Sequence, residues 1–194
     1  MRVLVIRAHP LDDSFNAALH ARTLAGLVRA GHEVDAVDLY AEDFDPRLSA
    51  PDRAQYHDPA APLPSDLVPY VERLRRAEAL VLVFPVWCFG VPAILKGFFD
   101  RVLRPGVAFE LVDSRVAPKL QHIRKLAAVT TYGRPRWMIW YVGDLPKRQI
   151  TRYLRWFCHP RAKAEYLAHY HMNASTPVSR AAFLDRVERR MAGF

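Results

Sequence analysis

The sequence predicts an α/β fold of three layers, with helices on both faces of a doubly wound parallel sheet. Short apolar runs rich in β-branched residues alternate along the chain with segments whose apolar residues recur at helical spacing. The runs at 2–8 and 79–84 are apolar at nearly every position, which is typical of central parallel strands covered on both faces. With 194 residues, 51% of them hydrophobic, the chain fits one domain with a substantial core.

Five strands are expected, at 2–8, 33–40, 79–84, 125–131 and 163–172. Helices are expected between and after them, at 14–30, 65–78, 92–104, 147–157 and 179–191. Start and stop residues support these bounds: Gly31 follows the first helix, Ser65 is the predicted N-cap of the second, and Pro92 suits the start of the third. Thr176 and Pro177 form a start signal for the last helix. The segment 41–64, rich in Pro, Asp and Ala, is predicted to be a long surface excursion.

Charge and composition disfavour several classes of function. The formal net charge is +8, but the basic residues are scattered over all the predicted helices without the spacing of a helix-turn-helix or zinc finger, so no nucleic-acid partner is expected. No uninterrupted apolar run is long enough for a membrane span, and the amino-terminal residues lack the pattern of a secretory signal, so we expect a cytoplasmic protein without membrane insertion. Cys88 and Cys158 have no matching metal-ligand spacing and are expected to be free thiols.

A metal site is not expected either. His169 and His171 share one face of the predicted strand 163–172, which would suit a pair of metal ligands. Two such ligands without a third nearby are more often structural.

The first candidate binding loop, His9 to Asn16, follows the first strand. In open α/β sheets, ligands bind beyond the carboxyl ends of the strands. This loop opens a helix, so free backbone N–H groups and the helix dipole favour an anion there, with Ser14 and Asn16 as further donors. It lacks the glycines of dinucleotide-binding and nucleoside-triphosphate motifs. The residues alone leave open whether Asp12, Asp13 and Ser14 only cap the helix.

The second loop, 84–92, follows the third strand and carries Trp87 and Phe89 between proline and glycine. Flat apolar side chains beside exposed backbone N–H groups suit a planar heteroaromatic ring with polar edges, such as an isoalloxazine. A hydrophobic plug over the core, or half of a subunit interface, would use the same residues.

The third loop, 130–136, follows the fourth strand. Its hydroxyls, one glycine and two cations suit the polar rim or the ribityl chain of a cofactor. The loop is a weak signal by itself.

Together these segments resemble the NAD(P)H:quinone oxidoreductase family with the flavodoxin-like fold, including its short bacterial members. The matching segments are HPLDDSFNAAL (9–19), DLYAEDFDPRLSAPD (38–52), FPVWCFGVPAILKGFFDRVL (84–103) and TTYG (130–133). The resemblance covers nearly the whole chain and is weakest after Gly133. It implies a flavodoxin-like three-layer α/β/α fold, with a five-stranded parallel sheet in the order 2-1-3-4-5.

The resemblance also implies cofactor contacts in each loop. The contacts to the flavin phosphate and ribityl chain are His9, Ser14, Phe15 and Asn16. Those to the isoalloxazine are Pro85, Val86, Trp87, Cys88 and Phe89, with main-chain donors toward N5 and the carbonyl edge. Those to the other edge of the ring are Thr130, Thr131, Tyr132 and Gly133. The Ser-Phe-Asn form of the first loop favours FAD, with FMN as the alternative.

The chain departs from the longer eukaryotic members at the group that stabilises reduced flavin. Those members have a second glycine where this chain has Tyr132, and a nearby Tyr and His that steady the charge. This chain has no His between His122 and His159, so the candidate catalytic residues are Tyr132, Arg134 and Tyr141.

The function that follows as a hypothesis is a flavin-dependent NAD(P)H oxidoreductase that reduces quinones or similar small acceptors by ping-pong hydride transfer. Members of the family are commonly homodimers with the active site at the interface, so a homodimer is expected. An azo- or nitroreductase differs only in its acceptor. A regulatory ancillary flavoprotein of a potassium efflux system is the alternative from another class.

Overall fold

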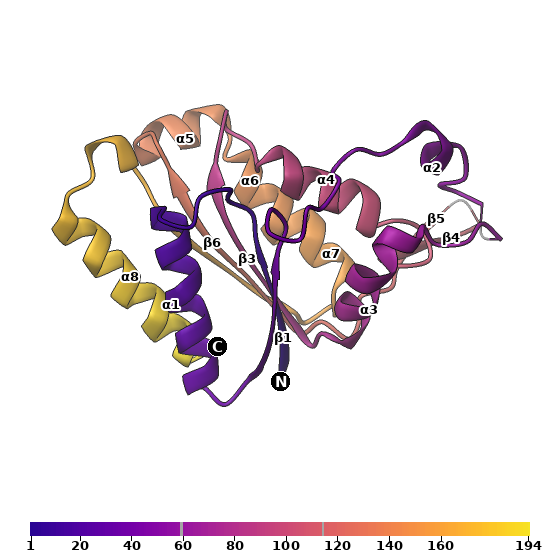
Figure 1. Cartoon of the computed structure of the whole chain (residues 1–194), viewed down its shortest axis with the longest axis horizontal. Coiled ribbons are helices and arrows are strands. Elements are labelled where there is room, and N and C mark those ends of the chain that lie inside the picture. Colours follow the sequence, from indigo (N-terminus) through magenta and orange to yellow (C-terminus); the bar gives the residue numbers. More distant parts are fainter. Residues whose placement is uncertain (59, 114) are drawn as a thin grey trace.

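A five-stranded parallel sheet organises the computed structural model, which describes residues 1–58, 60–113 and 115–194. In sheet order the strands are β2 (Glu33–Asp38), β1 (Arg2–Arg7), β3 (Ala79–Val86), β6 (Lys125–Tyr132) and β7 (Lys163–His169) (Figure 1). Counted within the sheet alone, this order is 2-1-3-4-5, which confirms the predicted topology. Because every neighbouring pair in the sheet is parallel, the carboxyl ends of all its strands lie at one edge, called here the carboxyl edge.

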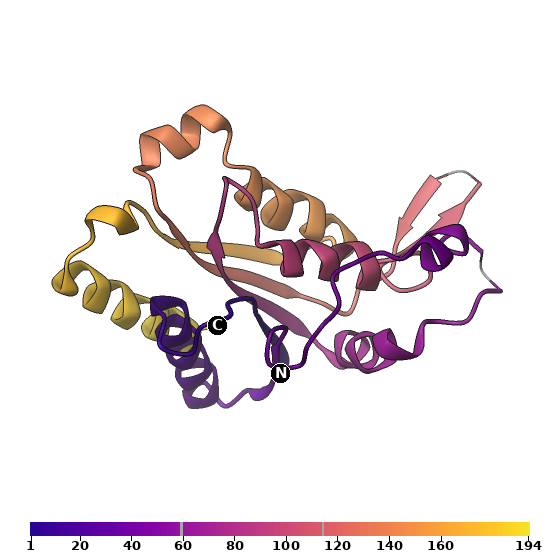
Figure 2. The same cartoon turned by 45° about the horizontal axis from the view of Figure 1, so that its top comes forward.

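Helices lie on both faces of this sheet (Figures 1 and 2). The helices α1 (Phe15–Arg29) and α8 (Pro177–Ala192) cover one face, and α3 (Val68–Arg76), α4 (Ala93–Val102) and the α6–α7 segment cover the other. Side chains of the strands alternate between the two cores. Val81 and Val83 of β3 face α1 and α8, whereas Leu80 and Leu82 belong to the larger core on the other face. This two-sided burial explains the continuous apolar character of β3 in the sequence.

The remaining elements are α2 (Ala50–Ala54), η1 (Ser65–Leu67), β4 (Phe109–Val112), β5 (Arg115–Pro118), α5 (Arg136–Val142), α6 (Leu145–Arg148), η2 (Gln149–Leu154), α7 (Arg155–Phe157) and η3 (Met172–Ala174). The antiparallel pair β4–β5 and the helix α5 were not predicted. The first is short and largely exposed, so it has no buried face to produce a pattern. The expected helix 147–157 begins two residues earlier, at Leu145, and its middle part is the π-helical η2.

One helix start was predicted correctly and another was predicted wrongly. Thr176 is the N-cap of α8, and its side chain and that of Ser179 form a reciprocal capping box. Ser65, in contrast, does not cap α3: it opens the 3₁₀ turn η1, and α3 begins at Val68 without a side-chain cap. Pro69 in the first turn of α3 has no N–H group for a cap to bind.

A buried arginine of α4 fixes the first part of the predicted excursion, at residues 45–52. The guanidinium of Arg101, a residue 4% exposed, donates to the carbonyl of Asp45 at 2.7 Å and forms ion pairs with Asp52 and Asp66. The backbone of Pro46 passes so close to α4 that a Cβ atom at Gly97 would lie 2.3 Å from it. Over residues 1–58, 60–113 and 115–194, no helix is long and apolar enough to cross a bilayer.

Candidate functional site

A buried arginine at the end of β1 holds the first loop. Arg7 is 6% exposed, and its guanidinium binds Asp38 at 2.6 Å, Asp12 at 2.7 Å and the carbonyl of Leu11 at 2.7 Å. The two carboxylates balance a charge that would otherwise be costly to bury. Arg7 therefore ties the first loop to the end of β2 and fixes its path at the carboxyl edge.

The first turn of α1 combines capping with unused donors. Ser14 accepts the N–H of Ala17 at 3.1 Å and donates to the carbonyl of Leu11 at 2.8 Å, so it is the N-cap of the helix. Among the described residues, the amides of Phe15 and Asn16 have no hydrogen-bond partner. Both point from the positive end of a 15-residue helix. The capping alternative is correct for Ser14, and it leaves these two N–H groups available to an anion.

Asn16 is a buried side-chain amide at this edge. The residue is 3% exposed, and neither its Oδ1 nor its Nδ2 has a hydrogen-bond partner in the part of the chain that the structure describes. Buried side-chain amides are nearly always hydrogen-bonded, because an unpaired one costs about 1–3 kcal/mol. A ligand that reaches Asn16 would supply the missing partners.

His9 connects the first loop with the second. Its Nδ1 accepts the N–H of Leu11 at 3.0 Å, which leaves the ring proton on Nε2, and burial lowers its pKa below the usual 6.5. The imidazole and the Trp87 indole have ring centroids 5.7 Å apart, at an angle of 58°. At neutral pH, His9 is thus a neutral donor through Nε2, next to the aromatic part of the second loop.

The second loop turns sharply on two non-glycine residues. The amide and carbonyl groups of Trp87 and Gly90 bond to each other at 3.1 and 2.9 Å, and Cys88 and Phe89 between them have φ angles of +49° and +60°. Side chains at such angles cost about 1 kcal/mol or more each, and a turn of this kind normally takes Gly, Asn or Asp. Trp87 is 42% exposed, and Cys88 is also exposed. The turn therefore presents aromatic surface and the N–H groups of Cys88 and Phe89 at the carboxyl edge.

Pro85 and Val86 belong to the end of β3, not to a loop as predicted. A proline fits there because the pairing of β3 with β1 ends at Val83. Pro85 is buried and Val86 is half-buried, beneath the exposed turn.

The third loop is buried, and its tyrosine is hydrogen-bonded inside the protein, whereas Oγ1 of Thr130 is buried without a hydrogen-bond partner in the described residues. Thr130, Thr131 and Tyr132 are at most 9% exposed. The Tyr132 hydroxyl donates to Oδ1 of Asp144 at 2.5 Å and shares a second hydrogen bond of 2.6 Å with the Tyr166 hydroxyl. Its ring stacks on Tyr170 at 4.8 Å. Burial raises the pKa of Tyr132, so this hydroxyl stays protonated and is bound inside the protein.

The last part of the third loop contacts η3 and His171, the residue before η3. A Cβ atom at Gly133 would lie 3.2 Å from Oδ1 of Asn173, and the carbonyl of Arg134 accepts the N–H of His171 at 2.9 Å. The Arg134 side chain is exposed, and Tyr141 on α5 is 81% exposed. In the described residues, no hydrogen bond or ring contact joins either side chain to the first or second loop. The three candidate catalytic residues thus lie in different surroundings.

The positions of Phe15 and of the pair His169 and His171 differ from those that the sequence predicted. The Phe15 ring packs toward the core under α1, with its centroid 6.0 Å from that of His169, so its side chain supports the helix layer. The predicted strand 163–172 ends at His169, and His171 beyond it has φ +61°. The two histidines therefore do not share a strand face. The described residues contain no cluster of His, Cys, Asp or Glu placed to hold a metal ion.

Four residues around the edge were not predicted: Arg7, Asp144, Tyr166 and Tyr170. An arginine at the end of an apolar strand is a signal for Arg7. The other three meet Tyr132 only through tertiary contacts, which residue spacing does not reveal.

Comparisons with known proteins agree with the fold. The family described as flavodoxin-like fold matches residues 1–191. NAD(P)H dehydrogenase [quinone] 1 of Cavia porcellus is 35% identical over 147 residues, which cover 68% of this chain and 54% of that protein. Ribosyldihydronicotinamide dehydrogenase [quinone] of Homo sapiens is also 35% identical over 147 residues, covering 68% of this chain and 64% of that protein. The chain thus spans between half and two thirds of the length of these relatives.

Two solved structures match over almost the whole chain. Smu.1420 from Streptococcus mutans UA159 has a TM-score of 0.87 at 26% identity and full coverage of both chains. The NAD(P)H:quinone oxidoreductase from Methanothermobacter marburgensis has a TM-score of 0.85 at 27% identity and covers 99% of this chain and 98% of that one. The chain therefore belongs to the flavodoxin-like fold family, and it is similar in sequence and structure to NAD(P)H:quinone oxidoreductases.

Proposed function

We propose that the protein binds a flavin at the carboxyl edge and is an NAD(P)H-dependent oxidoreductase that reduces quinones or similar small acceptors. The observation that carries the proposal is the buried amide of Asn16, which has no partner in the described residues and lies beside two unused N–H groups of α1. A flavin phosphate and ribityl chain offer both the acceptors and the donors that this amide and these N–H groups need. The chemistry of the donor set therefore fits the cofactor that the related proteins suggest.

The contacts divide among the loops as follows. The phosphate and ribityl chain would be held by His9, Ser14, Asn16 and the amide of Phe15. The ring would be held by Trp87, Cys88 and Phe89, above Pro85 and Val86. The other edge of the ring would be bordered by Thr130, Thr131, Tyr132 and Gly133. When bound, the flavin supplies the redox chemistry, since it accepts a hydride from a nicotinamide and passes the electrons to an acceptor.

In this proposal the chain's own groups bind and orient the flavin and exclude water from the site. The N–H groups of Cys88 and Phe89 are fixed by the closed turn, so they stabilise negative charge without reorganising. Trp87 covers the site with apolar surface, which strengthens those hydrogen bonds by keeping water out.

The three candidate catalytic residues take different parts in this proposal. Tyr132 positions the third loop through Asp144 and Tyr166, because its hydroxyl is already bound twice. Arg134 and Tyr141 remain the candidates for stabilising charge on the cofactor, since their side chains are exposed and have no partner in the first or second loop among the described residues.

The form of the flavin is proposed from the sequence. The Ser-Phe-Asn loop favours FAD, and FMN is the alternative. Mass analysis of the cofactor released from purified protein decides between them.

A homodimer is part of the proposal. The apolar surface that supports it includes Trp137, Trp140 and Tyr141 of α5, which are between 66% and 81% exposed, in addition to the exposed Trp87. Light scattering at assay concentration checks it: a mass of about twice 22.2 kDa is expected, and a mass near 22.2 kDa contradicts an obligate dimer.

Turnover assays test the activity. Flavin-loaded protein is expected to oxidise NADH or NADPH only when an acceptor is present, faster with a benzoquinone than with an azo dye or a nitroaromatic. Preference for the azo dye or nitroaromatic would instead support the azo- or nitroreductase alternative. No turnover with any acceptor, together with stable association with a membrane transport protein, would support the regulatory alternative.

A further inference from the structure

A pocket of about 260 Å³, called here the α5 pocket, lies between α5, the α6–η2 segment and Tyr170, the residue after β7. Asp144 on its wall accepts the Tyr132 hydroxyl at 2.5 Å, and the Tyr170 ring on another wall stacks on the Tyr132 ring at 4.8 Å. Tyr132 ends β6 and is paired with Val86 at the end of β3, and α5 follows β6 along the chain (Figure 1). The pocket therefore adjoins the third loop, at the carboxyl edge where the flavin is proposed to bind.

Four of the side chains that line the α5 pocket are cations, and one is a carboxylate. The cations, all exposed, are Arg136 of α5, Lys147 and Arg148 of α6, and Arg152 of η2. The carboxylate is Asp144. Among the described residues, no carboxylate forms an ion pair with any of the four cations. The pocket thus has an excess of positive charge that the neighbouring side chains do not balance.

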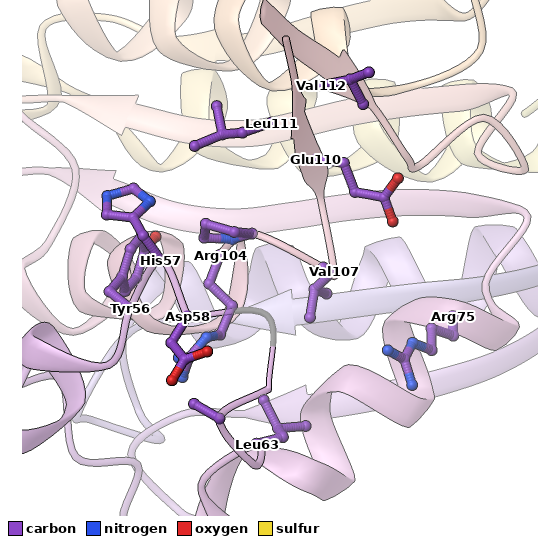
Figure 3. Close-up of a pocket in the computed structure, with 13 residues that line it drawn as sticks. Tyr56, His57, Asp58, Leu63, Arg75, Arg104, Val107, Glu110, Leu111 and Val112 are labelled. Atoms are coloured by element: carbon purple, nitrogen blue, oxygen red, sulfur yellow. The ribbon is translucent and has the colours of Figure 1, made fainter. Parts of the chain in front are cut away.

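A larger cavity beside β4 shows that this excess is particular to the α5 pocket and does not follow from the formal net charge of +8 alone. That cavity has a volume of about 600 Å³, and its walls carry as many carboxylates as Lys and Arg side chains (Figure 3). They are the cations Arg75 and Arg104 and the carboxylates Asp58 and Glu110. Of the two, the α5 pocket is therefore the one that attracts a highly charged anion.

Arg136 is arranged to bind a phosphate. Its guanidinium lies over the Tyr170 ring, 6.0 Å from the ring centre, and none of its N–H groups donates to another described residue. A guanidinium held against a ring keeps its N–H edges free for the two parallel hydrogen bonds that a phosphate accepts. Trp140, which is 81% exposed, adds a flat apolar ring to the same pocket. An arginine beside such a ring matches a phosphate joined to a purine nucleoside.

The partner of the carboxylate distinguishes between the two nicotinamide dinucleotides. In dinucleotide-binding folds, an acidic side chain binds the ribose 2′-hydroxyl of NADH, whereas an arginine accommodates the 2′-phosphate of NADPH. In the α5 pocket, Oδ1 of Asp144 is already bound to the Tyr132 hydroxyl, and the four cations have no carboxylate partner among the described residues. These charges suit a 2′-phosphate better than a 2′-hydroxyl.

We propose that the α5 pocket binds the 2′-phosphate and the adenine of NADPH, so that NADPH is preferred over NADH as the electron donor. The phosphate pairs with Arg136 and Arg148, which approach it from α5 and from α6, and the adenine packs on Trp140. The identity of the donor rests on the proposed function. The binding of a 2′-phosphate in the pocket does not, because it can be measured without turnover.

Calorimetric titration of the full chain with adenosine 2′,5′-bisphosphate and with 5′-AMP tests the pocket, because these two probes differ only in the 2′-phosphate. The bisphosphate is expected to bind at least about tenfold more tightly, since it gains charge-assisted hydrogen bonds to arginine. Its affinity is expected to fall with added salt, because the cations are exposed. Inorganic phosphate, which has no adenine, is expected to bind at least about tenfold more weakly than the bisphosphate.

Matched arginine variants assign the contact. Arg136→Gln and Arg148→Gln are each expected to weaken binding of the bisphosphate by about five- to fiftyfold, and to weaken binding of 5′-AMP less. Both positions are exposed, so the variants are expected to fold, which circular dichroism checks. Arg161→Gln, an exposed arginine outside the pocket, is the control and should leave both affinities unchanged.

Steady-state kinetics connect the pocket to the donor. With flavin-loaded protein and a benzoquinone as acceptor, kcat/KM is expected to be at least about tenfold higher for NADPH than for NADH. The difference should lie in KM, because the 2′-phosphate takes no part in the chemical step. In Arg136→Gln the ratio of the two kcat/KM values should fall toward one, and in Arg161→Gln it should match the wild type.

Four results overturn the proposal. They are equal affinities of the folded wild-type chain for the bisphosphate and 5′-AMP, inorganic phosphate that binds as tightly as the bisphosphate, bisphosphate binding that is unchanged in both Arg136→Gln and Arg148→Gln, and a kcat/KM that favours NADH. A different result would contradict the proposed function and leave the 2′-phosphate site in place: a chain that retains no flavin and oxidises neither donor, yet binds the bisphosphate more tightly than 5′-AMP through Arg136.

Discussion

The first and third loops meet the same carboxyl edge, but two of their buried side chains, Asn16 and Tyr132, are in opposite situations. Asn16 in the first loop has no partner in the described residues, whereas the Tyr132 hydroxyl in the third loop has two, Asp144 and Tyr166. A buried group with all its partners inside the protein stabilises the fold. One without partners lowers stability, so its presence points to a ligand. The contrast separates binding residues from supporting residues at one site.

Replacing Asn16 is expected to have the largest effect on binding. Asn16→Leu should weaken flavin binding by about ten- to a hundredfold, because hydrogen bonds to a phosphate or ribityl group are lost. The same change should raise the stability of the flavin-free protein by about 1 kcal/mol or more, because an unpaired buried amide is removed. Thermal unfolding and a flavin titration measure the two effects.

A control for Asn16 lies on the same helix. The hydroxyl of the buried Thr23 donates to the carbonyl of Leu19 at 2.8 Å, so Thr23→Val should leave flavin affinity unchanged. If Asn16→Leu destabilised the flavin-free protein and left flavin affinity intact, Asn16 would be a structural residue.

Tyr132→Phe is expected to show the opposite pattern. It leaves Asp144 and Tyr166 without their shared partner, which should lower the free energy of unfolding by about 1–3 kcal/mol. Flavin affinity should change less than about threefold, since the hydroxyl does not contact the ligand in this account. Denaturant unfolding and the same flavin titration decide; a tenfold loss of affinity at unchanged stability would move Tyr132 to the binding residues.

Trp87 in the second loop is expected to be a binding residue, like Asn16. Because Trp87 is 42% exposed, Trp87→Ala should cost the flavin-free protein little stability, yet weaken flavin binding by about five- to tenfold through lost ring contact. The fully buried Phe84, on the strand β3 that leads into this turn, is the contrast: Phe84→Ala should cost about 3–5 kcal/mol. Melting temperatures that fell equally in both variants would make the turn part of the core. Phe89, which is half-buried, is expected to lie between these two cases.

The smallest effect concerns pH and His9. Burial lowers the pKa of folded His9 below 6.5, so the folded protein binds fewer protons than the unfolded chain as the pH falls through this range. Its contribution to stability is therefore complete above about pH 6.5 and decreases as the pH falls from there toward the folded pKa. Protonation also turns Nδ1 into a donor facing the N–H of Leu11, which should loosen the first loop. Flavin affinity measured from pH 7.5 downward should fall in the wild type and stay flat in His9→Gln.

The sequence predicted the sheet well because β1, β3 and β6 are buried on both faces and are continuously apolar. It missed the β4–β5 pair and α5, most of whose apolar residues are exposed and therefore follow no burial period. For the site, the loops were found from their place after the strands. The distinction between Asn16 and Tyr132 was not found, because it depends on partners 12 and 34 residues away from Tyr132 and on the lack of any partner for Asn16 among the described residues.

Flavin binding by the wild-type chain tests whether the carboxyl edge is a flavin site. Purified protein, stripped of ligand and titrated with FAD and separately with FMN, is followed by visible absorbance after removal of the unbound flavin. The account predicts retention of one flavin per chain for at least one of the two, with the band shifts of a bound isoalloxazine. No retained flavin with either one, from a protein that remains folded by circular dichroism, would contradict the assignment of the carboxyl edge as a flavin site.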